Sequence, residues 1–257
     1  MAARRTAELI DVLRRADVDF EAPSSLPGWS RLTIVCHLRY GATALLCMTT
    51  DALAGRQTAY YPSGRATQRP TTLAPAPHER PEHVLADWAR NAALLDDLWS
   101  SLGEDQWGVT VTEPPENPDL GPVPVARLAL ARLTELDVHG VDLDVGFPDW
   151  SPTLVDVALP TRLAWLPARR SNHRDVDRSL HGSWLFGRDG FRWIVSVDGD
   201  RVRSAPAGPT VARARATISG TRRDLLALLL GRRRRRPLEI HGDLDFGAAF
   251  ERAFPGP

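Results

Sequence analysis

The sequence contains no lysine, since all 32 of its basic residues are arginine. A mechanism that uses a lysine as a Schiff base or a general base is therefore excluded. The basic residues are balanced by 32 acidic residues, so the formal net charge is zero. A zero net charge disfavours general nucleic-acid binding, because recognition of a phosphate backbone usually needs a basic excess. We expect no nucleic-acid partner.

Cysteine is nearly absent too, with Cys36 and Cys47 as the only two. Eleven residues of one helix would separate them by roughly 16 Å, whereas a disulfide needs Cα atoms within about 7 Å. We therefore expect no disulfide, and Cys36 is interpreted as a core residue rather than a nucleophile. Two unpaired cysteines suit a reducing cytoplasm.

Long hydrophobic runs are missing as well. The longest strongly apolar run, Leu225 to Leu230, is far shorter than a membrane span. The first fifteen residues are charged and amphipathic and lack the apolar stretch of a signal peptide. The sequence therefore predicts a cytoplasmic protein without membrane association.

The remaining composition is that of an ordinary globular protein, with 257 residues, 43% hydrophobic and 25% charged. This length favours two domains. Residues 1–150 hold 13 arginines and 21 acidic residues, a net charge of −8, and residues 151–257 hold 19 and 11, a net charge of +8. One interpretation is two domains that attract each other, with the second steering an anionic ligand. The other is that the arginine run 232–236 alone tilts the sum.

Hydrophobic periodicity in the first half predicts helices joined partly by long loops. Ser30 or Thr33 can cap the second helix. The loop 55–78 is long enough to suggest a lid or a substrate-facing segment, and a second long loop covers 103–122. The pattern predicts a four-helix bundle with its site built from side chains on facing helices. The expected helices cover residues 4–16, 31–54, 81–102 and 123–144.

The pattern changes after residue 150, where short runs of β-branched and aromatic residues alternate with helical stretches. We expect helices at 152–168, at 225–230 (opened by Thr221) and at 246–254, and strands at 183–186, 191–197, 201–204, 211–219 and 238–240. The predicted organisation is a helical bundle over residues 1–150, followed by a smaller α+β domain over residues 151–257.

The most informative local feature is TELDVHGVDL, residues 134–143. Glu135 and His139 are four residues apart, so on a helix they share one face and lie about 6 Å apart along its axis. A carboxylate and an imidazole at this spacing can bind one metal ion. Asp142 is three residues further and could orient the imidazole of His139. Alone, such a pair is more often a solvated contact between neighbouring turns.

A third metal ligand has to come from another helix, and His37 is the candidate. It is the only histidine in the first two predicted helices. A single buried histidine is more often a hydrogen-bonded core residue than a ligand. If a facing helix brings Glu135 and His139 to the same depth, however, the three form a His-Glu-His set. Three protein ligands with one open position are typical of catalytic zinc.

Two motifs give the chain a family resemblance. LPGWSRLTIVCHL (residues 26–38) and ELDVHGVDL (residues 135–143) resemble the mycothiol-dependent maleylpyruvate isomerase family, a branch of the DinB-like four-helix-bundle proteins. That family has a Pro-Gly-Trp-Ser/Thr run with a histidine seven positions later. It also has a glutamate followed by a histidine at the fourth position and an aspartate three positions beyond. Residues 221–246, TRRDLLALLLGRRRRRPLEIHGDLDF, resemble its smaller C-terminal domain.

The resemblance implies a divalent metal, with zinc as the first candidate, on His37, Glu135 and His139, and mycothiol, the actinobacterial low-molecular-weight thiol, as cosubstrate. A metal with an open position can bind a thiol and deprotonate it near neutral pH. In an isomerase, the thiolate adds to the cis double bond of maleylpyruvate, the new single bond rotates, and elimination gives fumarylpyruvate. In a transferase, the thiolate attacks another electrophile and stays attached, or one thiol displaces another. We place thiol transfer or exchange slightly ahead of isomerisation.

Three departures and additions follow from the same comparison. Gly140 stands where the family usually has larger residues, and we expect it to leave a gap that widens the pocket for a different acceptor. Arg232 takes the position of the family's Gly-Arg and is the candidate catalytic residue of the second domain, binding an anionic substrate. The loop 55–78 carries Arg56, Arg65, Arg69, Tyr60 and Tyr61, which could bind a carboxylate or phosphate or could simply be solvated.

The expected partners are thus a small-molecule thiol and an anionic or electrophilic metabolite, and the protein is expected to be a monomer or a homodimer. The rival from another class is a non-catalytic carrier of a small ligand or lipid, because the second domain resembles sterol-carrier-like folds in outline. A pure carrier has no need of His37, Glu135 and His139. Iron or nickel could replace zinc, since imidazole and carboxylate suit several metals.

Overall fold

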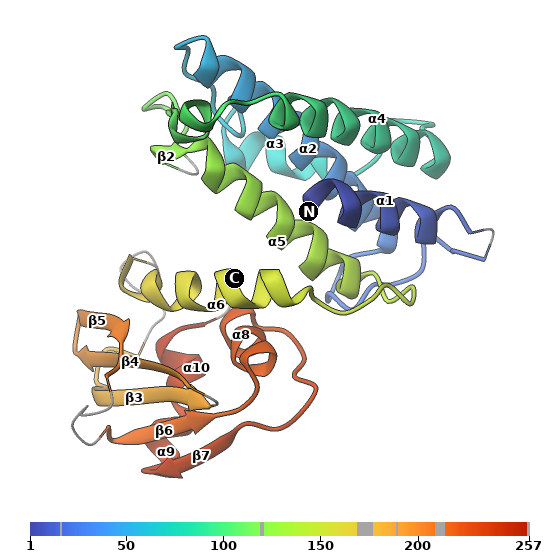
Figure 1. Ribbon diagram of the computed structural model, residues 1–257. Helices are drawn as coiled ribbons and strands as arrows, with labels where there is room; N and C mark the ends of the chain where they lie inside the picture. Colours follow the sequence, from blue (N-terminus) through green and yellow to red (C-terminus); the bar gives the residue numbers. More distant parts are fainter. Residues whose placement is uncertain (16, 119–120, 169–176, 189, 209–213, 256–257) are drawn as a thin grey trace. The chain divides into compact units, whose positions relative to one another are not determined.

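The computed structural model describes the whole chain except residues 16, 119–120, 169–176, 189, 209–213 and 256–257 (Figure 1). Its chain forms two compact units, Met1–Asp149 and Trp150–Pro257. The first is mainly helical and the second combines helices with a sheet, so the predicted fold class is confirmed.

Four long helices form the first unit (Figure 1). Helix α2 packs against α4 and α5, and α1 packs against the same two helices. Their apolar faces meet in a core that includes Leu9, Ile34, Trp88 and Leu136, each fully buried. The elements of this unit are α1 (Ala2–Leu13), α2 (Arg31–Leu53), α3 (Arg65–Thr72), α4 (Pro81–Ser100), η1 (Glu104–Gly108), β1 (Thr110–Val111), β2 (Val123–Pro124) and α5 (Val125–Asp142).

Helix α2 begins at a clear capping signal. The hydroxyl of Ser30 accepts a hydrogen bond from the backbone N–H of Thr33, 3.1 Å away, which pairs one of the free donors at the helix start. By length and composition alone α2 could cross a membrane, but 61% of its most apolar window is buried inside the unit. We therefore interpret α2 as the central core helix of the bundle.

Two segments that were predicted as loops contain regular structure. Within 55–78, the residues of α3 form a helix that has Pro70 in its interior. Within 103–122, η1 and β1 are ordered, and β1 pairs antiparallel with β2. The strand β2 occupies residues 123–124, so α5 begins at Val125 and not at residue 123. Short elements of this kind have no hydrophobic period that would reveal them.

The second unit is built on a five-stranded sheet in the order β5-β4-β3-β6-β7 (Figure 1). Only β3 and β6 pair in parallel among the paired strands described, and the other neighbours are antiparallel. The elements are α6 (Pro152–Ala164), β3 (His181–Arg188), β4 (Phe191–Asp198), β5 (Arg201–Pro206), β6 (Ala216–Ser219), α8 (Arg222–Leu230), β7 (Glu239–Gly242), α9 (Leu244–Ala248) and α10 (Phe250–Ala253).

Aromatic packing closes the core of this unit. The Trp184 ring stacks on Phe246 with a centroid distance of 4.2 Å, and its indole N–H donates to the Phe246 carbonyl. Thr221 caps α8, as predicted. The helix predicted over 246–254 is instead two short helices, α9 and α10, and the strand predicted over 211–219 is the shorter β6, with residues 211–213 outside the described part.

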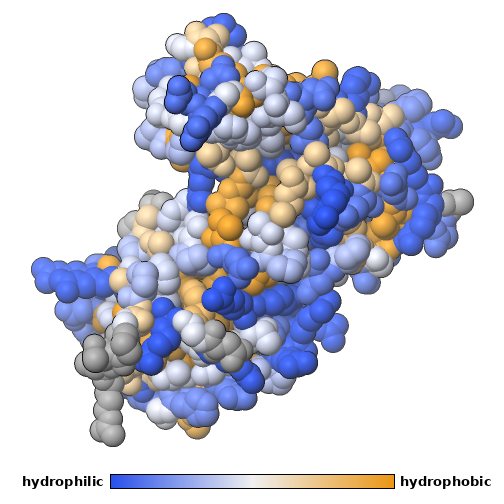
Figure 2. Space-filling model, in the orientation of Figure 1, coloured by the Kyte–Doolittle hydropathy of each residue, from blue (hydrophilic) through white to orange (hydrophobic). Residues whose placement is uncertain are grey.

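The surface carries both kinds of residue. In the view of Figure 2, hydrophilic residues cover most of the molecule and hydrophobic residues form smaller groups among them. The large apolar side chains that are exposed in the described part of the chain are Met1, Leu94, Val157, Trp165 and Leu244.

Candidate metal centre

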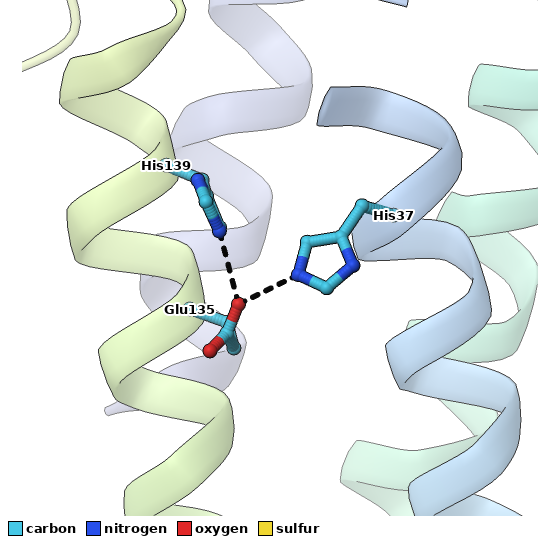
Figure 3. Close-up of side chains that lie close together, drawn as sticks. All are labelled: His37, Glu135 and His139. Atoms are coloured by element: carbon cyan, nitrogen blue, oxygen red, sulfur yellow. Dashed lines mark hydrogen bonds and ion pairs between the residues drawn. The ribbon is translucent and has the colours of Figure 1, made fainter. Parts of the chain in front are cut away.

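Three side chains meet between α2 and α5 in the first unit (Figure 3). The Nε2 atom of His37 lies 2.8 Å from Oε2 of Glu135, and Nε2 of His139 lies 3.1 Å from the same oxygen. The ligand atoms of the three residues all lie within 4.8 Å of one another. Residues 98 positions apart are thus held at one point, because the bundle packs α2 against α5.

Helical spacing explains why these side chains converge. Glu135 and His139 are one turn apart on α5 and point the same way. His37 faces them from the second turn of α2, whose start is fixed by the Ser30 cap. The histidines are largely buried, with side chains 13% and 11% exposed, whereas Glu135 exposes 40% of its side chain. Solvent and small molecules therefore reach the cluster from the Glu135 side.

This donor set fits a divalent metal ion. Two imidazole nitrogens and one carboxylate oxygen are ligands of catalytic zinc sites, which leave a fourth position open. In a tetrahedral site with bonds of about 2.0–2.1 Å, neighbouring ligand atoms are about 3.3 Å apart. The separations of 2.8 and 3.1 Å are close to this spacing. The side chains need only small shifts to place an ion between them.

Asp142 orients one of the imidazoles. Its Oδ2 atom lies 3.0 Å from Nδ1 of His139, and the residue is buried. A carboxylate accepts, so Nδ1 carries a proton that it donates to Asp142, and Nε2 is the nitrogen that faces Glu135. His37 lacks such a partner: its Nδ1 atom is buried and has no hydrogen-bond partner in the described part of the chain.

Hydrogen bonds set the charges in the cluster. Burial by itself raises the pKa of the Glu135 carboxyl, but the hydrogen bonds from His139 and His37 bring it well below its ordinary value. Burial by itself lowers the pKa of His139, yet Asp142 and Glu135 raise it to about 9. Without a metal, the cluster therefore contains a carboxylate and a protonated His139 at neutral pH. A metal ion has to displace that proton.

Trp29 forms a wall of the cluster, a role that sequence reasoning did not assign. Its ring stacks on His139 at 12° with a centroid distance of 6.1 Å, and it meets the His37 ring edge-on at 5.7 Å. Arg69 of α3 also lies near the Trp29 ring, with its Cζ atom 5.6 Å from the ring centroid. The available signal was the position of Trp29 in the Pro-Gly-Trp-Ser run.

The other residues of segment 55–78 have different surroundings. Arg56 pairs with Asp51 at the end of α2, and the Arg65 guanidinium lies 5.5 Å from the Tyr61 ring centroid. Tyr60 and Tyr61 pack with Tyr40 in one aromatic group. Of the three candidate arginines, Arg69 alone contacts a residue that touches the cluster, among the contacts described.

The gap expected at Gly140 is not there. A Cβ atom at this position would lie 2.4 Å from the Phe147 ring, so that side chain already fills the space. Phe147 is buried, and the Arg5 guanidinium lies 4.2 Å from its ring centroid. Arg5 in turn forms a buried ion pair with Asp137 of α5. Gly140 therefore allows close packing of Phe147 on α5 and does not widen a pocket, which corrects the prediction.

Arg232 belongs to the second unit and directly follows the left-handed Gly231 that ends α8. Its Nη1 atom donates to the Leu230 carbonyl, 3.0 Å away, and the residue is half-buried, whereas Arg233 to Arg236 are exposed. Its role in binding an anionic substrate stays a prediction. Cys36 is buried, and burial raises the pKa of its thiol to about 11, which fits a core residue.

The histidines that received no role stay without one. His181 pairs with Asp198 and His241 lies near Glu239, both on the surface of the second unit. His173 lies outside the described residues. In the part of the chain that the structure describes, His37, Glu135 and His139 form the single group with metal-ligand geometry.

Comparison with known proteins agrees with the fold and identifies the family. The family model "Mycothiol maleylpyruvate isomerase N-terminal domain" matches residues 1–144. Two solved structures, the mycothiol-dependent maleylpyruvate isomerase and a histidine-to-alanine mutant of it, superpose with TM-scores of 0.63 and 0.62. Each is 21% identical, and each match covers 90% of this chain and 87% of the other. No curated protein gives a significant match. Because the family model spans more than half of the chain, including all three clustered residues, the protein belongs to the mycothiol maleylpyruvate isomerase family.

Proposed function

We propose that the protein is a metal-dependent enzyme that activates mycothiol for reaction with a small electrophilic metabolite. The observation that carries the proposal is the convergence of His37, Glu135 and His139 from two helices within 4.8 Å. The family membership indicates mycothiol as the thiol. The two similar structures are of a mycothiol-dependent maleylpyruvate isomerase, so the isomerisation of maleylpyruvate is the reaction to test first. Transfer of the thiol to another electrophile is the second reaction.

The three clustered residues would hold the metal, with zinc as the first candidate. A bound divalent ion supplies Lewis acidity, which lowers the pKa of a thiol so that a thiolate exists near neutral pH. The residues supply the rest. Glu135 contributes a negative charge that offsets the cation, and Asp142 holds the Nδ1–H of His139, so that Nε2 is the nitrogen directed toward the metal.

The surroundings of the cluster close one of its sides and leave another open to reactants. Trp29 covers one side of both imidazoles, which limits the access of water to the ligand atoms. The exposed part of Glu135 marks the side from which thiol and electrophile enter. In the isomerisation, the thiolate forms a C–S bond at the cis alkene, the electron pair moves onto the adjacent carbonyl, and the C–C bond rotates. Reversal of these steps expels the thiolate and leaves the trans product.

The test is an assay of the metal-loaded protein with mycothiol. Maleylpyruvate and a panel of thiol conjugates are offered as substrates; thiol adducts are identified by mass, and the cis and trans isomers, which have equal mass, by their chromatographic separation. We expect either conversion to fumarylpyruvate without mass change or formation of a mycothiol adduct. His37→Ala should abolish both, whereas His241→Ala, on the surface of the second unit, should leave the rate unchanged. Protein that is purified without chelators, contains well under one ion per chain and is indifferent to His37→Ala would contradict the proposal.

A further inference from the structure

A buried arginine stands one helical turn before Glu135 on α5. Arg132 is 2% exposed. Its Nη1 atom donates to the backbone carbonyl of Leu38, the residue after His37, at 2.8 Å. Its Nη2 atom is buried and has no hydrogen-bond partner in the described part of the chain. A buried guanidinium normally has a carboxylate partner, because an unpaired charge in the interior is costly.

No carboxylate of the described residues lies within the 4.0 Å ion-pair distance of Arg132. Asp96 and Glu135 act on it only from further away. Burial lowers the pKa of Arg132 to about 10, so the side chain still carries its charge at neutral pH. The bundle therefore keeps a cation with a donor to spare next to a metal ligand.

Tyr60 brings a second donor to the same place. A Cβ atom at Gly41 of α2 would lie 3.3 Å from the Tyr60 hydroxyl and 3.5 Å from Nη1 of Arg132, so both groups border this glycine. Burial, and then the charge of Glu135, raise the pKa of Tyr60, which keeps the hydroxyl protonated. Gly41 is one turn beyond His37 on α2, as Arg132 is one turn before Glu135 on α5. The donors thus form the layer of the bundle directly next to the metal ligands.

We propose that Arg132 and Tyr60 bind a carboxylate group of the electrophile beside the metal centre. Guanidinium and phenol are both suited to a carboxylate, since each donates to its oxygens and the guanidinium supplies the opposite charge. Glu135, one turn along α5, exposes 40% of its side chain, and the carboxylate would enter this layer from that side. Bound there, an acidic electrophile has its reacting carbon held close to the thiolate. This inference rests on the proposed function and adds the acidic substrate class to it.

Equilibrium binding tests the site without turnover. The probe is maleate, a cis dicarboxylate, titrated against the full-length protein by calorimetry at constant ionic strength. Its neutral diamide and acetate are the comparison ligands. The diamide shows whether binding needs the acidic groups, and acetate shows whether any small carboxylate binds equally well. Each titration is repeated after metal removal with 1,10-phenanthroline, a chelator that has no carboxylate. A protein that holds no metal contradicts the proposed function. Maleate binding that disappears when the metal is removed contradicts this site, because the carboxylate then binds to the ion.

Arg132→Met should weaken maleate binding at least about tenfold, as expected for loss of a charged hydrogen bond. Tyr60→Phe should weaken it about threefold. The melting temperature of Arg132→Met without ligand should equal or exceed that of the natural protein, because an unpaired buried charge is removed. The matched control is Arg56→Met, which removes an arginine paired with Asp51 away from the cluster.

The alternatives give different results. If Arg132 only supports the fold, Arg132→Met lowers the melting temperature and folded molecules bind maleate as before. Arg132→Lys keeps the charge but loses the second N–H fork, and it should bind maleate with intermediate affinity. Wild-type affinity in both Arg132→Lys and Tyr60→Phe would overturn the proposal, even where Arg132→Met does not fold. Wild-type affinity in Arg132→Met together with weaker binding in Arg69→Met would overturn the proposal and assign the carboxylate site to Arg69, next to Trp29.

Discussion

His139 and Asp142 are joined by a hydrogen bond of 3.0 Å between Nδ1 and Oδ2, within the last turn of α5. Because Asp142 is buried, the bond is shielded from water and holds the imidazole in one orientation and one tautomer. His37, by contrast, has no partner for Nδ1 among the described residues. The two imidazoles of the cluster are therefore held differently: both face Glu135 through Nε2, but only His139 has a carboxylate on its Nδ1.

Removal of the carboxylate should weaken metal binding. For Asp142→Asn we expect an affinity for zinc about 10–100-fold lower, because partners of metal-ligating histidines contribute that much in general. The measurement is competition with a chromogenic chelator. Asp144→Asn is the control, since Asp144 is exposed two residues further along. Equal affinities of the two variants would show that Asp142 does not act on the metal.

The pKa of His139 gives a pH dependence in the metal-free protein. Asp142 and Glu135 outweigh burial and raise it from 6.5 to about 9. The raised value means that the folded state binds the proton more tightly than the unfolded state. The stabilisation is complete below about pH 6.5 and should be lost as the pH rises through about 9.

Urea unfolding of chelator-treated protein between pH 6 and 10 measures this effect. His139→Gln should flatten the decline in the free energy of unfolding over that range. Calorimetric zinc titration at pH 7.5 in buffers of different ionisation enthalpy should also detect release of a proton on binding. A stability that rises through pH 9 in the natural protein, or that falls equally in His139→Gln, would contradict the assignment.

The close packing of Phe147 on Gly140 predicts how a substitution at Gly140 changes the stability of the unit. Gly140→Ala removes a helix-interior glycine, which by propensity alone would stabilise α5 by up to about 1 kcal/mol. The new Cβ would meet the Phe147 ring at 2.4 Å, however, and forcing that ring away should destabilise the unit by about 1–3 kcal/mol. Chemical denaturation measures the sum. Gly108→Ala is the control, because nothing lies within 4 Å of a Cβ there.

A compensating variant checks the cause of that loss. Phe147→Leu gives a smaller side chain against α5, so Gly140→Ala should cost less in this background than in the natural protein. If the two changes add without interaction, Phe147 is not the residue that requires the glycine.

The long helices and the cluster were predictable because both follow from spacing. Glu135 and His139 share a face by helical geometry alone, and Ser30 is a typical N-cap that predicts the start of the helix carrying His37. The pairing of these helices was an expectation of the bundle fold and of the family motifs. The long helices and the cluster do not depend on the details of packing, because a turn of helix tolerates small changes in neighbouring side chains.

Features that depend on tertiary contacts were missed or wrong. Nothing in the sequence near Gly140 shows that Phe147 folds back onto it, so an empty space was expected where a ring lies. Arg132 received no role from the sequence, and its burial follows only from the approach of α2 and Tyr60. The short helix α3 has Pro70 in its interior, a residue that usually indicates a loop.

Trp29 should report metal binding directly. Its ring stacks on His139, so a quenching ion such as Co²⁺ held by the cluster would lie next to the Trp29 ring. We expect Co²⁺ to quench part of the intrinsic fluorescence, with an end point at one ion per chain. Trp29→Phe should remove most of that quenching while the ion still binds, as measured by metal content after gel filtration. Trp107→Phe is the control, because this ring packs near Trp99 in the other apolar cluster of the first unit, and it should leave the quenching unchanged. Quenching that survives in Trp29→Phe but disappears in Trp107→Phe would mean that the ion binds away from His37, Glu135 and His139.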